Sequence, residues 1–159
     1  MNYGFVRVGV ATPELKVADC KYNAEKIIEM MRDSEDKNIK IVFIAGPSSS
    51  GKTTFAQRLS IQLRVNGKKT YAISLDDYFV DRHLTPKDEN GDYDFETIDA
   101  LDLELFNDNL MDLMEGETVQ IPVYNFLEGR REYTREPVKL TNDHIIIVEG
   151  IHGLNDELT

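Results

Sequence analysis

The run IKIVFIAGPSSSGKT, residues 39–53, decides the fold. Its first seven residues are almost entirely apolar, which is typical of a strand buried on both faces within a parallel sheet. The remainder fits G-x-x-x-x-G-K-[ST] at every fixed position, and an amphipathic helix is predicted over residues 52–65, ended by Gly67. A buried strand that leads through a glycine-rich turn into a helix predicts a loop that cradles phosphate groups.

The residue types in this loop suit phosphate and Mg²⁺. Its glycines allow a tight turn that directs backbone amides at the phosphates, and the helix N-terminus adds positive potential. We expect Lys52 to reach the β- and γ-phosphates, Thr53 to bind Mg²⁺ through its hydroxyl, and Thr54 to face the helix packing. The predicted nucleotide-binding residues are Gly46, Ser48, Ser49, Ser50, Gly51, Lys52, Thr53 and Thr54.

Strand and helix patterns alternate along the rest of the chain. This order predicts a three-layer α/β sandwich with a mainly parallel sheet, of the phosphate-loop NTPase type, and a small β-hairpin insertion around Gly129. Residues 76–96 are polar and are expected to form a long functional loop. The other expected elements are strands 5–10, 70–75 and 145–148, helices 18–32 and 97–114, and an antiparallel pair formed by 119–126 and 133–140.

Acidic residues follow two of the predicted parallel strands. Asp76 and Asp77 come after strand 70–75, and Glu149 comes after strand 145–148. Ligand-contacting residues lie beyond the carboxyl ends of parallel strands, so these acids are expected near the phosphate loop. We expect Asp76 to accept a proton from a substrate hydroxyl and Glu149 to hold Mg²⁺, directly or through water. For Asp77, a supporting role at the site and a structural role both stay open.

The composition indicates one globular domain. Hydrophobic residues make up 41% of the 159 residues, and the net charge of −11 disfavours a general nucleic-acid binder. No apolar run approaches the roughly 18 residues of a membrane helix, and the N-terminus lacks the basic and apolar regions of a signal peptide. The single cysteine, Cys20, excludes an internal disulfide, so a cytoplasmic protein is expected.

Five sequence blocks go beyond a generic phosphate loop. They are GPSSSGKTT at 46–54, SLDDYF at 74–79, YDFETIDALDLELF at 93–106, IPVYNF at 121–126 and IIIVEGIHGL at 145–154. In this order and spacing they resemble the uridine kinase family and its phosphoribulokinase relatives. The resemblance implies ATP- and Mg²⁺-dependent phosphorylation of a small-molecule hydroxyl, usually the ribose 5′-hydroxyl of a nucleoside such as uridine or cytidine.

The resemblance also implies roles for individual residues. Asp76 matches the catalytic base of the family, and Glu149 matches the Mg²⁺-linked acid. Asp76 and Lys52 are the expected catalytic residues. Glu96 matches an acidic position that hydrogen-bonds the nucleoside sugar, and Tyr124 matches an aromatic position near the base. The family also has a basic position near the substrate, with a less defined role, and Arg131 falls near this position.

Two departures from the family pattern keep other functions open. Gly129 stands where the family places a base-reading histidine, and the family continues past Leu154 with an arginine-bearing lid that neutralises charge on the phosphoryl group. We therefore expect weak or absent turnover. The alternatives are a nucleotide-binding module or engineered scaffold without turnover, and a kinase of another small hydroxyl compound, such as a sugar phosphate or pantothenate. Apolar edges left by truncation are expected to favour homo-oligomers.

The N-terminal segment resembles a different family. Residues 1–31 are similar to the first strand and helix of the nitrilase-type glutaminase domain of glutamine-dependent NAD synthetases, but Cys20 lies outside any catalytic motif, so no activity is implied. We expect a chimera, with a strand–helix segment at 1–38 and a kinase-like domain at 39–159. The first strand is expected to pack beside strand 39–45. Alternatively, the segment forms a partly ordered arm.

Overall fold

The computed structural model describes residues 16, 22, 25–27, 29–30 and 40–158. The predicted strand 5–10, and with it the expected neighbour of strand 39–45, lies outside the described residues. Within the predicted helix 18–32, the described residues 22, 25–27 and 29–30 are helical. Ile27 packs against the core cluster formed by Ala56, Leu59, Leu63 and Ile147. The division at residue 38 and the chimera stay predictions.

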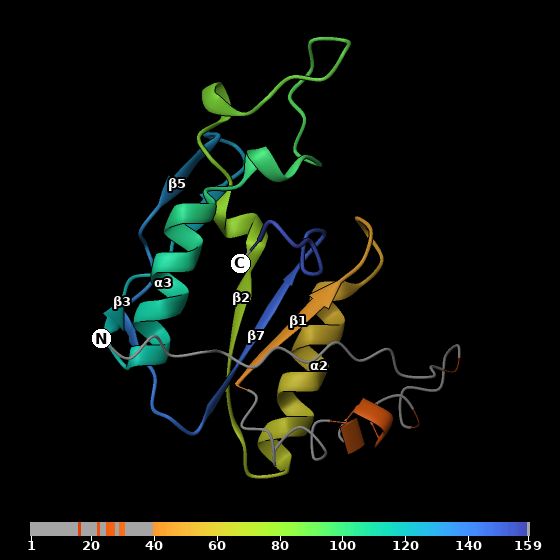
Figure 1. Ribbon diagram of the computed structural model, residues 1–159, viewed down its shortest axis with the longest axis vertical. Helices are drawn as coiled ribbons and strands as arrows, with labels where there is room; N and C mark the ends of the chain where they lie inside the picture. The colour runs from red at the N-terminus through yellow and green to blue at the C-terminus, as the bar shows by residue number, and fades with distance from the viewer. Residues whose placement is uncertain (1–15, 17–21, 23–24, 28, 31–39, 159) are drawn as a thin grey trace.

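Three parallel strands form the main sheet (Figure 1). Their order is β1 (Ile41–Ala45), β7 (His144–Gly150) and β2 (Lys69–Ser74), which confirms the predicted parallel sheet. The central strand β7 is buried from Ile146 to Gly150, whereas β1 is half-buried along its whole length. Ile41 and Phe43 pack against the core on one face of the sheet, and Val42 and Ile44 pack against it on the other. The prediction that β1 is covered on both faces is therefore confirmed, although its side chains are only partly buried.

Two helices cover opposite faces of the sheet, α2 (Lys52–Val65) and α3 (Leu103–Glu115). Ile147 packs against α2, whereas its neighbours Ile146 and Val148 join the cluster beneath α3, as expected for side chains that alternate along a strand. Figure 1 shows the resulting layers of helix, sheet and helix, which confirm the three-layer α/β sandwich. The buried apolar helix residues are Ala56, Leu59 and Leu63 from α2 and Phe106, Leu110 and Leu113 from α3.

The bounds of α2 agree with the predicted helix 52–65, and Gly67 ends it as expected. Gly67 has φ +80°, a left-handed conformation that glycine adopts without a steric penalty. Its N–H donates to Arg64 O (3.0 Å), and the N–H of Lys68 donates to Leu63 O (3.0 Å). This pair of bonds is the Schellman motif, which satisfies the last carbonyls of the helix.

The predicted helix 97–114 is wrong in its first turns. Ile98–Ala100 forms a short 3₁₀ turn, η3, and α3 begins only at Leu103. The N-cap of α3 is Asp102, whose carboxylate accepts the N–H of Leu105 at 3.0 Å. Aspartate at this position favours a helix start, because it satisfies an amide that has no partner within the helix.

Two short antiparallel pairs follow α3. β3 (Thr118–Val119) pairs with β6 (Val138–Lys139), and β4 (Val123–Asn125) pairs with β5 (Arg130–Glu132). The hairpin between β4 and β5 turns at Gly129, with φ +67°, which confirms the predicted insertion.

The prediction that 119–126 and 133–140 pair as antiparallel strands is confirmed only where Val119 pairs with Val138. The second strand begins earlier, at Arg130, and both strands are interrupted. Pro122 and Pro137 lie in the interrupted stretches and lack the N–H that a continuous ladder needs.

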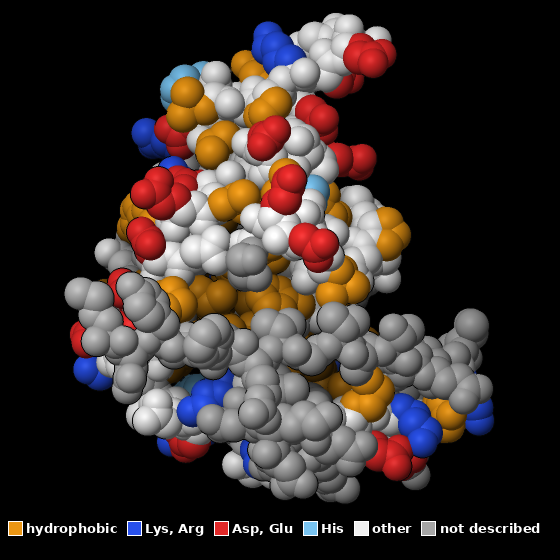
Figure 2. Space-filling model, in the orientation of Figure 1, with side chains coloured by type: hydrophobic (Ala, Val, Ile, Leu, Met, Phe, Trp, Pro, Cys, Tyr) orange, Lys and Arg blue, Asp and Glu red, His pale blue; other side chains and the backbone are white. Residues whose placement is uncertain are grey.

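The loop 76–96 is more structured than a plain polar loop. It begins within η1 (Leu75–Tyr78) and contains η2 (Arg82–Leu84), both 3₁₀ turns. No described helix is both long and apolar enough to cross a membrane. Figure 2 shows acidic side chains over the upper part of one face, consistent with the net charge of −11.

A close contact between Gly150 and Leu75 joins the ends of β7 and β2. A Cβ added at Gly150 would lie 2.7 Å from the Cβ and Cδ1 atoms of Leu75, which is almost fully buried. We expect Gly150→Ala to lower the free energy of unfolding by about 1–3 kcal/mol, the usual cost of overpacking. Urea unfolding measures this effect, with the exposed Thr118→Ala as control. An unchanged midpoint in Gly150→Ala would contradict the packing.

Candidate active site

The predicted phosphate-binding loop connects β1 to α2. Ser49 (φ +59°) and Gly51 (φ +90°) both adopt left-handed conformations, and Ser50 N–H donates to Pro47 O at 3.2 Å. A Cβ at Gly46 would lie only 3.0 Å from the Ser50 hydroxyl, so this glycine permits a close turn. No side chain caps the N-terminus of α2, which leaves its first amides to bind an anion.

Glu149 connects the loop to the sheet. Its side chain is buried, and its Oε1 atom accepts hydrogen bonds from the Thr53 hydroxyl (3.0 Å) and the Ser74 hydroxyl (2.9 Å). In the sheet, Glu149 is paired in register with Ser74 on one side and Ile44 on the other. The two predicted Mg²⁺ ligands, Thr53 and Glu149, are therefore in direct contact.

Asp76 is the second residue of η1 and is exposed to solvent, and it lies close enough to Glu149 and Lys52 for their charges to shift its pKa. Partial desolvation raises the pKa of the Asp76 carboxyl above its ordinary value, and the negative charges of Glu149 and Asp77 raise it further. Lys52 opposes this effect and lowers the pKa. The Lys52 ammonium itself donates to Pro47 O at 2.9 Å. The side chains of Asp76, Lys52 and Glu149 thus share one corner of the sheet.

Tyr124 is buried and belongs to a cluster of aromatic side chains. Its ring makes edge contacts with Phe126 and Phe79, with centroids 5.0 Å and 5.6 Å away, and a longer contact with Phe95 at 6.4 Å. The hydroxyl is buried and has no hydrogen-bond partner within the described part of the chain. Burial raises the pKa of Tyr124, which keeps the hydroxyl protonated and able to donate to a ligand.

Three other predicted residues, Glu96, Arg131 and Thr54, have surroundings of their own. Glu96 is exposed, and its backbone N–H donates to Asp94 Oδ1 at 2.9 Å. Arg131 donates to Asp102 Oδ2 at 2.6 Å in a half-buried ion pair. Thr54 is exposed, so the prediction that it faces the helix packing is wrong, because other positions of α2 carry the buried face.

Ser74 and Asp77 also contact residues of the site, although the sequence does not predict Ser74 and assigns no single role to Asp77. Ser74 is the last residue of β2, and its contact with Glu149 becomes visible only when the strand order is known. Asp77 accepts the N–H of Tyr124 (3.3 Å) and is paired with Arg135 at 2.8 Å. Sequence position gives no signal for that pairing, because its two partners are far apart in the chain.

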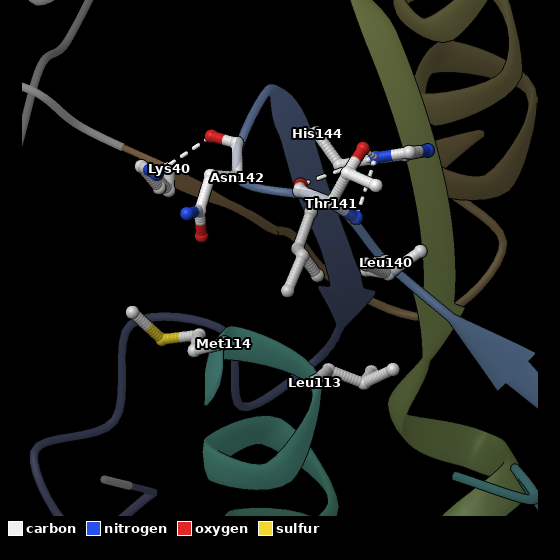
Figure 3. A pocket seen from close by; sticks show the side chains of 8 residues that line it. Lys40, Leu113, Met114, Leu140, Thr141, Asn142 and His144 are labelled. Carbon is white, nitrogen blue, oxygen red and sulfur yellow. Dashed lines mark hydrogen bonds between the residues drawn. The ribbon is translucent and has the colours of Figure 1, made fainter. Parts of the chain in front are cut away.

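A small cavity of about 20 Å³ lies at the opposite end of the sheet. Figure 3 shows Lys40, His144 and Thr141 at its rim, with the Lys40 ammonium donating to Asn142 O at 2.6 Å. Drug-sized ligands occupy pockets of roughly 300–1,000 Å³. This cavity is therefore too small to hold a nucleotide.

Residues 41–158 match the phosphoribulokinase / uridine kinase family. A uridine kinase of Schizosaccharomyces pombe is 37% identical over 123 residues, which are 76% of this chain and 26% of that protein. A uridine kinase of Aliivibrio fischeri (strain MJ11) is 35% identical over 128 residues, or 79% of this chain and 59% of that protein. The chain thus spans only part of the length of these relatives.

Solved structures show the same fold. A possible uridine kinase from Bacillus stearothermophilus superposes with a TM-score of 0.63 at 24% identity, covering 86% of this chain and 76% of that one. A D-glycerate 3-kinase from Cryptococcus neoformans superposes with a TM-score of 0.56 at 18% identity, covering 86% and 53%. At these identities the superpositions establish the architecture alone.

Proposed function

The chain belongs to the phosphoribulokinase / uridine kinase family, and from this we propose that it transfers a phosphoryl group from Mg·ATP to the 5′-hydroxyl of a nucleoside, uridine or cytidine. The observation that carries the proposal is the meeting of Thr53, Ser74 and Glu149 beside Asp76 and Lys52. The named uridine kinases among the relatives support the nucleoside as acceptor.

The residues present fit a magnesium ion. Mg²⁺ prefers oxygen ligands and is usually held by one or two protein groups together with substrate phosphates. Thr53 Oγ1 and Glu149 Oε1, 3.0 Å apart, offer such a pair, and Ser74 orients the carboxylate through its second hydrogen bond. Among the described residues, no group of three or more His, Cys, Asp or Glu side chains is arranged to hold a metal.

The loop fits the phosphates of ATP. Gly51 has a left-handed conformation and the N-terminus of α2 is uncapped, so the first backbone N–H groups of the helix are available to phosphate oxygens. Lys52 adds a full positive charge at the same place. When bound, Mg²⁺ and these donors offset the negative charge that spreads over the transferring phosphoryl group.

Asp76 is suited to act as the general base. It is exposed to an entering acceptor and its pKa is raised, so the carboxylate is a better proton acceptor than an ordinary aspartate. We propose that Asp76 accepts the proton of the acceptor hydroxyl. We assign Tyr124, whose hydroxyl has no partner among the described residues, to contact with the base of the acceptor nucleoside. Glu96 and Arg131 stay predicted contacts to the acceptor.

The test is ADP release from Mg·ATP with and without a panel of nucleosides, followed by identification of the phosphorylated product. Saturable release with uridine or cytidine, and a 5′-monophosphate as product, is the expected result. If no acceptor stimulates release while ATP still protects the fold against heat, the chain is a nucleotide-binding module without turnover.

One observation favours a second candidate, a kinase of another small hydroxyl compound. A Cβ at Gly129 would lie 2.8 Å from Arg82 Cβ and 2.9 Å from its Nε, so the position cannot carry a side chain without moving Arg82. The resemblance implies a base-reading histidine there. A panel that also contains sugar phosphates and pantothenate separates the two candidates by the acceptor with the highest kcat/KM.

A further inference from the structure

The carboxylate of Asp77 joins two parts of the candidate site. Asp77 follows the proposed base Asp76 within η1, and its side chain is only 14% exposed. One oxygen, Oδ1, accepts the backbone N–H of Tyr124 in β4 at 3.3 Å. The other, Oδ2, accepts Arg135 Nη1 at 2.8 Å. Asp77 therefore binds the strand that carries the acceptor-side tyrosine through one oxygen, and Arg135, which follows β5, through the other.

Arg135 is itself held in place. The same Nη1 atom lies 3.4 Å from the carbonyl of Pro122, directly before β4. The Gln120 side-chain amide donates to the carbonyls of Tyr133 and Arg135, at 3.2 Å each. The guanidinium thus reaches Asp77 from a segment that is cross-linked to the residues before β4.

The turn η1 is anchored on its other side by the core. Tyr78 is fully buried, and its hydroxyl accepts the side-chain N–H of Asn109 on α3 at 3.3 Å. The carbonyl of Tyr78 accepts the N–H of Asp102 at 2.9 Å. With η1 fixed to the core, the bonds of Asp77 set where β4 lies relative to Asp76.

We propose that the ion pair of Asp77 with Arg135, together with the Asp77–Tyr124 bond, is a positioning bridge that holds the acceptor-side strand β4 against the catalytic turn η1. Arg135 is then a positioning residue for phosphoryl transfer. The proposal rests on the proposed function for its catalytic consequence. Its structural part, that Arg135 holds β4 on η1, can be tested without turnover.

The kinetic test compares Arg135→Ala with Arg135→Lys and Arg130→Ala. Arg130 is the matched control, since it is an exposed arginine in β5, close to Arg135 in the chain, and its Nε lies 3.8 Å from Glu132. We expect Arg135→Ala to lower kcat/KM for the acceptor about tenfold, because a charge-assisted bond that orients a reactant is lost. KM for Mg·ATP is expected to stay within about twofold, since the phosphate loop is untouched. Arg135→Lys restores part of the loss.

Amide hydrogen exchange tests the bridge independently of activity. Arg135→Ala is expected to speed exchange in residues 122–126 and 75–78 but not in 46–53, and Arg130→Ala is expected to leave all three segments unchanged. Unchanged exchange in Arg135→Ala overturns the proposal. Faster exchange with unaltered acceptor kinetics overturns the catalytic part. If the wild-type chain shows no acceptor-dependent turnover, both the proposed function and the catalytic role of Arg135 are contradicted. Hydrogen exchange then still tests whether Arg135 holds β4 on η1.

Discussion

Asp76→Asn is expected to lower kcat for acceptor-dependent ADP release by about 10³-fold, within the range that general bases contribute. Asparagine keeps the shape of the side chain but cannot accept the proton of the acceptor hydroxyl. The affinity for Mg·ATP is expected to change little, because Thr53 and Glu149, which are assigned to the metal, are not altered. Steady-state kinetics and ATP-induced thermal protection measure the two effects separately.

The same variant is expected to be more stable than the wild type. The pKa of Asp76 is raised in the folded chain, so the folded state favours the protonated, uncharged carboxyl. The stability gained from that form is present at low pH and is lost as the pH rises through the folded pKa. At neutral pH the ionised Asp76 therefore destabilises the fold, and Asn removes this charge. A marked fall in Tm would show damage to the fold, and unchanged kcat in a stable variant would contradict the role of Asp76.

The pH dependence of the wild type follows from the same shift. Desolvation is the largest cause of the raised pKa of Asp76; Glu149 raises this pKa further, Lys52 lowers it and Asp77 raises it. We expect kcat/KM to fall on acidification at a higher pH than an ordinary aspartate would give, because kcat/KM reports the free enzyme, in which the base becomes protonated there. The residual activity of Asp76→Asn should lack this acidic limb. A wild-type profile that is flat down to the ordinary range of aspartate would contradict the assignment.

The features predicted correctly from the sequence depend on local patterns. The loop 46–53 and α2 follow from a fixed motif between an apolar strand and an amphipathic helix, and Gly67 marks the helix end. The candidate acids Asp76 and Glu149 follow from their place at strand ends, because parallel strands present their carboxyl ends on one edge. Such information is contained within short windows of sequence.

The features that were missed depend on contacts between distant residues. The bond from Ser74 to Glu149 requires β2 to lie beside β7, and the pair of Asp77 with Arg135 requires the hairpin to fold back on η1. The strands near Gly129 were misplaced because two prolines interrupt an otherwise β-type pattern. Helix α3 was extended too far because Leu101, although apolar and buried, lies before the N-cap. Apolar spacing predicts burial more reliably than it predicts a helix start.

Lys52→Ala is expected to lower kcat/KM by about 10³-fold and to remove most of the protection that Mg·ATP gives against heat. Lys52 is the first residue of α2, so its charge adds to the potential of the helix N-terminus where the phosphates are proposed to bind. Alanine favours the helix, so the fold should be retained. Lys139→Ala, an exposed lysine on β6, is the matched control and should behave as the wild type.

The Lys52 variant should also change the behaviour of the base. Lys52 lowers the pKa of Asp76, so removing it leaves desolvation and the negative charges of Glu149 and Asp77 unopposed. The acidic limb of the residual activity is therefore expected to move to higher pH in Lys52→Ala, a shift that loss of ATP affinity alone cannot produce. Saturating Mg·ATP separates the two effects. A tenfold or smaller loss of kcat/KM would contradict phosphate binding by the loop, whereas a large loss with an unmoved acidic limb would place Asp76 outside the reach of this lysine.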